Sequence, residues 1–120
     1  MKKLLCGVVF ASPDDEEYDR MAHVWIRDAE TAYWFSLSRG VNSDVIEVMA
    51  SDQRSQTSGG LGVILSPTGI LVRVNHDLAR ALDGYSEYAT EFHPESQDVG
   101  SIRETLEVIF RGKSGLLTST

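Results

Sequence analysis

The chain has few of the residues from which small proteins build cross-links and metal sites. Its 120 residues include one cysteine, three prolines and three histidines. The single cysteine, Cys6, cannot form a disulfide within the chain, which favours a reducing compartment. The histidines are His23, His76 and His93, and they show neither HxH nor HxxxH spacing. The sequence therefore predicts no metal site and no cofactor.

Long apolar stretches are also missing. No run approaches the ~18 apolar residues that a membrane-spanning helix needs. The chain begins with MKKLLCGVVFAS, in which two lysines precede an apolar run, but this run is shorter than that of an export signal. We therefore expect a cytoplasmic protein that does not act on membranes, with residues 4–10 as a buried strand.

The charge balance leans strongly to one sign, with a formal net charge of -7 at pH 7. An anionic surface repels the phosphate backbone of nucleic acids and attracts basic ligands or proteins. We therefore expect a basic protein, and not a nucleic acid, as the partner.

Length and composition are those of one domain. With 42% hydrophobic residues, 120 residues can bury one compact core. We expect a single α+β domain over residues 1–112 and a loosely held tail at residues 113–120.

The segment at residues 12–38 is compatible with two structures. Ser12, Pro13 and the acids after them are typical of a helix start, in which a serine cap precedes proline. Residues 23–27 and 32–38 are instead rich in aromatic and β-branched residues, and RDAET between them can close a hairpin. We favour the hairpin, preceded by an acidic loop at residues 14–19.

The rest of the chain alternates strand patterns with two helix patterns. We expect strands at residues 45–50, 61–65, 70–74 and 85–92, and the turn SPTG makes the middle two a hairpin. A short helix follows the capping residue Asn75, and a longer one carries apolar residues at spacings of three, four and three from Val99. This order predicts a mainly antiparallel sheet packed on one face by a short helix and a longer C-terminal helix.

The stretch SDQRSQTSGG, residues 51–60, separates two apolar runs. It lacks the lysine and hydroxyl residue of a phosphate-binding P-loop and leads into a strand rather than a helix. We expect a solvated loop at residues 52–58. Gly59 and Gly60 then allow a bulge or a close approach as the chain re-enters the sheet.

No catalytic or calcium-binding motif is evident. No serine lies in a G-x-S-x-G elbow, and an enzyme would require the fold to gather two of the three histidines in one cleft. The acids Asp14, Asp15, Glu16, Glu17 and Asp19 lack the alternating ligands and central glycine of an EF-hand. They are better suited to steering a basic partner.

Three segments, read together, resemble a known family. These are AYWFSLSRG, VIEVMASDQRSQTSGGLGVILSPTGILVRVNHDLARALDG and LEVIF. Their order is similar to that of the tenth family of immunity proteins in bacterial polymorphic toxin systems. The likeness covers residues 32–110, and its matched residues are Asp52, Gln53, Gly59 and Gly60. It implies an α+β domain.

The resemblance also implies a function, which is to bind a cognate toxin domain and neutralise it by occlusion without catalysis. A basic nuclease domain fits the acidic charge as the toxin. The expected contact residues are Asp14, Asp15, Glu16, Glu17, Asp19, Asp52, Gln53, Arg54 and Gln56. Trp25 or Trp34 would join them if exposed, but we expect both tryptophans to be buried. The alternatives are a regulatory or scaffold module, including a homodimer formed through an exposed sheet edge, and, third, an enzyme.

Overall fold

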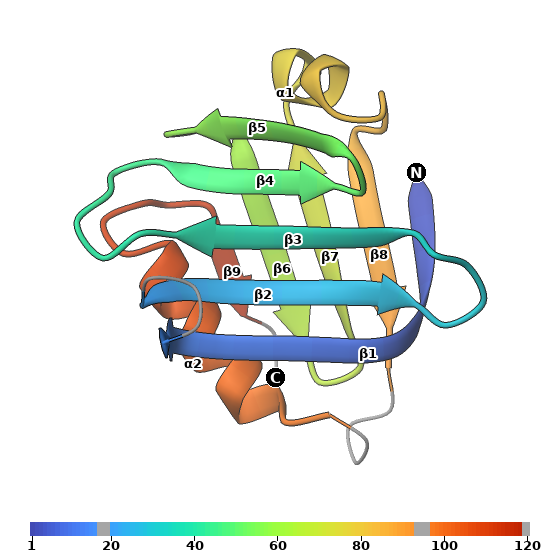
Figure 1. Cartoon of the computed structure of the whole chain (residues 1–120), viewed down its shortest axis with the longest axis horizontal. Coiled ribbons are helices and arrows are strands. Elements are labelled where there is room, and N and C mark those ends of the chain that lie inside the picture. The colour runs from blue at the N-terminus through green and yellow to red at the C-terminus, as the bar shows by residue number, and fades with distance from the viewer. Residues whose placement is uncertain (17–19, 93–96, 119–120) are drawn as a thin grey trace.

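Nine strands and two helices follow one another along residues 1–16, 20–92 and 97–118, which this computed structural model describes (Figure 1). They are β1 (Lys2–Asp15), β2 (Met21–Asp28), β3 (Trp34–Arg39), β4 (Ile46–Ala50), β5 (Gln53–Thr57), β6 (Leu61–Ser66), β7 (Gly69–Val74), α1 (His76–Ala81), β8 (Glu87–Glu91), α2 (Val99–Ile109) and β9 (Leu116–Thr118). The strand order is β5-β4-β3-β2-β1-β8-β7-β6-β9, and only the β1–β8 and β6–β9 pairs are parallel. The prediction of one mainly antiparallel α+β domain is confirmed.

The long strand β1 takes part in both halves of this sheet. Its first residues, 2–5, pair in parallel with β8, whereas residues from Cys6 onward pair antiparallel with β2. The register shifts between Cys6 and Val8, and such a shift bends a strand so that it can turn a corner between packed sheets. In Figure 1, β2–β5 run across the view, and β6–β8 run steeply behind them. We call β2–β5, with β1 from Cys6 onward, the front half. The back half comprises residues 2–5 of β1 with β8, β7, β6 and β9.

Asp28 fastens the corner at which β1 changes partners. Its side chain is buried and accepts hydrogen bonds from the backbone N–H groups of Leu5 (3.0 Å), Glu30 (2.8 Å) and Thr31 (3.1 Å). These donors, with that of Glu30 contributing most, hold the pKa of the carboxyl below its usual range. An ionised carboxylate thus ties the start of β1 to the β2–β3 turn.

The core lies between the two halves, because alternate residues of each strand point inward. Its members include Val24, Ile26, Phe35, Leu37, Ile46 and Val48 from the front half, and Leu4, Val63, Leu65, Ile70, Val72 and Tyr88 from the back half. The rings of Phe35 and Tyr88 stack with centroids 4.4 Å apart. Full burial of each such apolar side chain stabilises the fold by ~1.5–3 kcal/mol before entropy.

The two helices close the open ends of the folded sheet. Asn75 caps α1 by accepting a hydrogen bond from Leu78 N, and Asp98 caps α2 in the same way from Ser101 N. The helix α1 contacts β5, whereas α2 contacts β1, β2, β3 and β9. The predicted layer of two helices on one sheet face is therefore met only in part, since strands of the other half cover most of that face.

The local predictions had mixed outcomes. The two hairpins, β2–β3 and β6–β7, are confirmed. The predicted loop at residues 52–58 is wrong, because Gln53–Thr57 forms β5, antiparallel to β4. Pairing with an apolar neighbour outweighs the low strand propensity of this polar segment.

Strand structure also extends further than expected near both ends of the chain. The predicted acidic loop at residues 14–19 begins within β1, which continues to Asp15. The C-terminal segment, expected to be loosely held, places Leu116–Thr118 beside β6 as β9. Neither helix in the described part of the chain is long and apolar enough to cross a membrane.

Candidate protein-binding face

The outward side of the front half presents two complete rows of residues. Register pairs join Phe10, Trp25, Ser36, Met49 and Arg54 in one row, and Ser12, His23, Ser38, Glu47 and Gln56 in the next. Paired residues on adjacent strands point to the same side of a sheet. The pair of Arg27 and Trp34 extends the surface. We call these rows and this pair the front face, and no helix lies in front of it in Figure 1.

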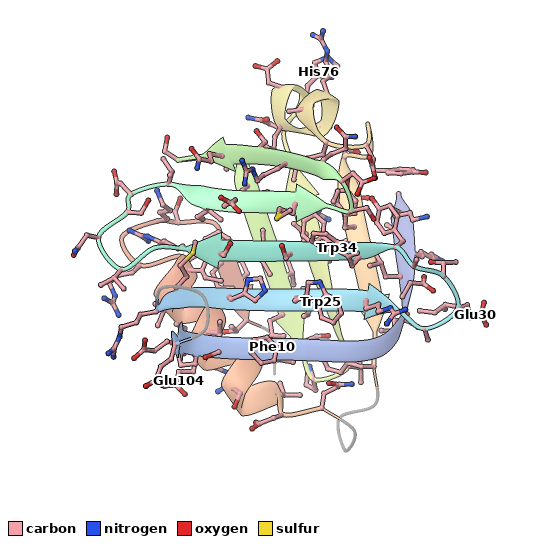
Figure 2. The ribbon with its side chains drawn as sticks, in the orientation of Figure 1. Phe10, Trp25, Glu30, Trp34, His76 and Glu104 are labelled. Atoms are coloured by element: carbon pink, nitrogen blue, oxygen red, sulfur yellow. The ribbon has the colours of Figure 1, made fainter. Side chains whose placement is uncertain are left out.

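Three aromatic side chains stand on neighbouring strands of the front face. Figure 2 shows Phe10, Trp25 and Trp34 on the front of β1, β2 and β3. Phe10 is 42% exposed, and both tryptophans are half-buried. The ring of Phe10 also lies against that of His23, with centroids 6.0 Å apart. Aromatic groups of this kind carry most of the binding energy in protein interfaces.

Two serines lie low between these larger side chains. Ser36 is 1% exposed and Ser38 is 5% exposed, although both point outward. Ser36 has Trp25 and Met49 as its row neighbours, and their size accounts for its burial. The Ser36 Oγ forms no hydrogen bond within the described residues. Around Ser36, a partner would therefore meet mainly the side chains of Trp25 and Met49.

The front face itself carries no excess of negative charge. Arg27 and Arg54 are exposed on it, and Glu47 is half-buried. At the far end of β1, the Asp14 carboxylate is held by two nitrogens of Arg20, at 2.5 and 3.0 Å. The anionic character of the chain therefore lies around this face rather than on it.

The residues predicted to contact a partner lie at opposite margins of the front half. Asp52, Gln53, Arg54 and Gln56 are exposed on or beside the edge strand β5, and Arg54 and Gln56 belong to the front face. Asp14 and Glu16 are exposed at the β1 margin; Glu17, Asp19 and the side chain of Asp15 lie outside the described residues. Four strand spacings separate the margins, about 19 Å. A typical interface of about 800 Å² per partner can reach both.

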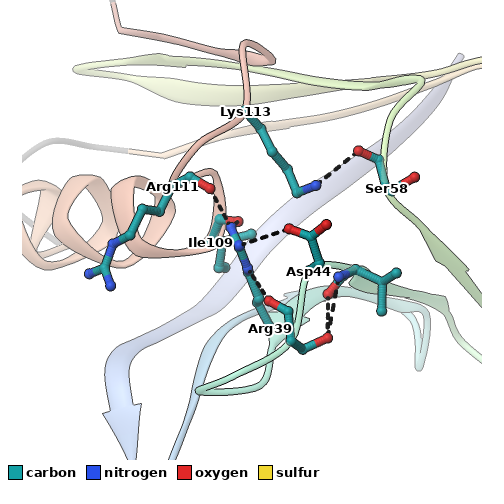
Figure 3. A network of polar contacts seen from close by, with 8 residues as sticks. Arg39, Asp44, Ser58, Ile109, Arg111 and Lys113 are labelled. Atoms are coloured by element: carbon teal, nitrogen blue, oxygen red, sulfur yellow. Dashed lines mark hydrogen bonds and ion pairs between the residues drawn. The ribbon is translucent and has the colours of Figure 1, made fainter.

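Arg39 anchors the end of β3 to the end of α2 (Figure 3). Its guanidinium donates to the carbonyl oxygens of Ser43 (2.8 Å), Ile109 (2.9 Å) and Arg111 (2.7 Å). Beside it, Lys113 Nζ donates to Ser58 O at 2.9 Å. The bonds of Arg39 tie β3 to the end of α2, and the bond of Lys113 ties the turn after β5 to the segment that follows α2.

Only the second residue of the double glycine is required by the local geometry. Gly60 has a φ of +73°, and a Cβ there would lie 2.1 Å from Asn75 Nδ2, so only glycine fits. A Cβ on Gly59 would meet nothing within 4 Å. The predicted close approach on re-entering the sheet thus occurs at Gly60, where Asn75 N also donates to Gly60 O at 2.9 Å.

A lysine and two tyrosines form a cluster beside α1. No pattern in the sequence predicted this cluster. Lys2 Nζ lies 4.4 Å from the ring centroid of Tyr33 and 5.9 Å from that of Tyr85. Tyr33 Oη donates to Asp83 Oδ2 at 2.5 Å. Burial and, second, this carboxylate raise the pKa of Tyr33 far above its usual value. The cluster is filled by the chain's own cation and stabilises the N-terminus.

Two hollows lie beside the C-terminal end of α2. One, of about 330 Å³, is lined by Arg20, Arg39 and Arg111, of which the first two are engaged as described above. The other, of about 560 Å³, is lined by Lys113 and by glycines of both adjoining segments. Neither is lined by a histidine; His23 lies on the front face, His76 is exposed on α1, and His93 lies outside the described residues. No group of potential metal ligands occurs in the described part of the chain.

Comparison with known proteins identified no relative of this chain. The chain matches no family model, no curated protein and no solved structure.

Proposed function

We propose that the chain is an immunity protein that binds a bacterial toxin domain and blocks it by occlusion, without catalysis. The front face is the observation that carries this proposal, because Phe10, Trp25 and Trp34 stand together on the outward side of β1, β2 and β3, in front of which no helix lies. The resemblance at residues 32–110 supplies the class of partner. The interaction takes place in the cytoplasm, with neither nucleic acid nor membrane as partner.

Affinity and association rate come from different parts of the surface. The aromatic side chains provide apolar area that a partner can bury at ~25 cal/mol per Å². The net charge of -7 attracts a basic toxin, such as a nuclease domain, over a longer range. Because Arg27 and Arg54 lie within the front face, we expect the basic surface of the toxin to face the rim and its apolar surface to face the aromatics.

The proposal is tested with the toxin domain encoded beside the gene of this chain. Co-expression should restore growth of cells that make the toxin, and the purified proteins should bind each other. A Phe10→Ser/Trp34→Ser variant should bind at least tenfold more weakly and lose protection. Val41→Ser serves as the matched control, because Val41 is 68% exposed between β3 and β4, outside the rows of the front face, and its loss should leave binding unchanged.

Circular dichroism of each variant separates lost binding from lost folding. Added salt should slow the association of the wild-type proteins, since it screens the attraction between opposite charges. A chain that neither binds nor protects against the neighbouring toxin contradicts the proposed function. Full protection by a folded Phe10→Ser/Trp34→Ser variant would instead overturn the assignment of the front face.

A further inference from the structure

The outward side of the back half carries a row of residues that spans all five of its strands and is apolar on four of them. Register pairs join Lys3, Ala89, Leu71, Ile64 and Leu117 across β1, β8, β7, β6 and β9. Leu117 is 62% exposed, and Leu5, nearby on β1, is 52% exposed. The three central side chains of the row are half-buried. We call this row, with Leu5 and the rows beside it, the back face.

The rows on either side of this apolar row balance its charge. One joins Leu5, Glu91, Gly69 and Ser66, and the other joins Glu87, Arg73 and Gly62. The back face thus holds two cations, Lys3 and Arg73, and two anions, Glu87 and Glu91. Its net charge is zero on a chain of net charge -7. Two copies of this anionic chain repel each other over most of their surface. Two back faces do not, because each has no net charge.

Gly62 gives an independent indication of a close neighbour on the back face. A Cβ at this position would meet only Gly115 O, at an ordinary 3.5 Å, and the φ of Gly62 is not positive. Gly69 differs, because its Cβ would lie 2.7 Å from Thr90 O. Glycine weakens a strand interior and often marks a place where another backbone approaches. The chain's own packing explains Gly69 but leaves Gly62 unexplained.

We propose that two copies of this chain associate back face to back face as a two-fold symmetric dimer. A two-fold interface requires a patch that complements itself, and the back face does so because its apolar residues share it with equal numbers of positive and negative side chains. Permanent interfaces between identical chains are more apolar than transient ones, which suits the leucine and isoleucine side chains of this row. The front face then stays open in each copy. This dimer does not depend on the toxin-binding proposal.

Analytical ultracentrifugation of the full chain tests the dimer. The wild-type chain should sediment at twice its monomer mass of 13.3 kDa. Leu117→Asp should raise the dimer dissociation constant about a hundredfold or more, because both copies lose an apolar contact and gain a buried charge. Val41→Asp is the matched control: Val41 is 68% exposed between β3 and β4, and the same change there should leave the dimer intact.

A second variant distinguishes the interface from folding. Gly62→Ala should leave the unfolding midpoint of the monomer unchanged or raise it, yet weaken the dimer several-fold. Added salt should strengthen the dimer, because it screens repulsion between two anionic chains, whereas it slows toxin association. A wild-type chain that stays monomeric at its highest soluble concentration overturns the proposal. Equal dissociation constants for Leu117→Asp and Val41→Asp overturn the back face as the interface.

Discussion

The ring of Phe35 stacks on that of Tyr88, with centroids 4.4 Å apart and planes inclined by 28°. Phe35 belongs to β3 and Tyr88 to β8, so this contact joins the two halves of the folded sheet at the centre of the core. Phe35 is 1% exposed and Tyr88 is 2% exposed. The stacked pair therefore helps to hold the front and back halves together.

Phe35→Ala should lower the free energy of unfolding by ~3–5 kcal/mol, because it leaves a cavity between the two halves. Urea denaturation followed by fluorescence measures this loss. Phe10→Ala is the matched control, since Phe10 is 42% exposed on the front face and its loss should change stability much less. Equal losses for the two variants would contradict a core centred between the halves.

The two adjacent glycines should differ sharply in their tolerance of a side chain. Gly60→Ala places a Cβ against Asn75 and forces alanine to a φ of +73°, so we expect a loss of more than about 1 kcal/mol. Gly59→Ala meets no neighbour and should leave stability unchanged or slightly higher. Thermal unfolding of the two variants side by side measures the difference. A destabilised Gly59→Ala with an unaffected Gly60→Ala would refute this assignment of roles.

The sequence predicts those elements whose signals are local. The β6–β7 hairpin follows from proline and glycine in SPTG, and α1 follows from its cap Asn75. The edge strand β5 could not be predicted in this way, because its stability comes from pairing with β4 and its own residues are polar. The strand β9 depends in the same way on β6.

The front face also depends on distant parts of the sequence. Trp25 and Trp34 could be named as aromatic anchors only on the condition that they were exposed, and periodicity alone did not decide this. Phe10 was missed, because residues 4–10 read as a fully buried strand. The bend in β1 turns Phe10 outward beside Trp25, and the register shift after Cys6 that permits it has no clear sequence signal.

Arg39 should contribute to stability mainly through the hydrogen bonds of its guanidinium. Arg39→Met keeps most of the apolar stem but removes the hydrogen bonds to Ser43, Ile109 and Arg111, which we expect to cost ~2–4 kcal/mol. Urea denaturation gives the total loss, and faster amide hydrogen exchange near the C-terminal end of α2 should locate it. Arg111→Met removes an exposed arginine and should cost less than about 0.5 kcal/mol. Similar losses for both variants would show that the carbonyl contacts of Arg39 contribute little.

Asp28 should make the fold sensitive to acid. Its pKa is lower in the folded chain than the ordinary value of about 3.9, so its ionised form stabilises the fold at neutral pH. This contribution is complete well above pH ~3.9 and is lost as the pH falls through the lower, folded pKa. Unfolding by urea, measured from neutral pH down to about pH 3, should therefore show a shallower loss for Asp28→Asn than for the wild type. Part of the dependence of the unfolding free energy on pH should remain, because Asp98 also has a lowered pKa through its hydrogen bonds to Ser101.

Glu104→Gln is the control for Asp28→Asn, because it is an exposed change on α2 and should retain the pH dependence of the wild type. An Asp28→Asn profile parallel to that of the wild type would mean that the corner of β1 does not depend on this carboxylate.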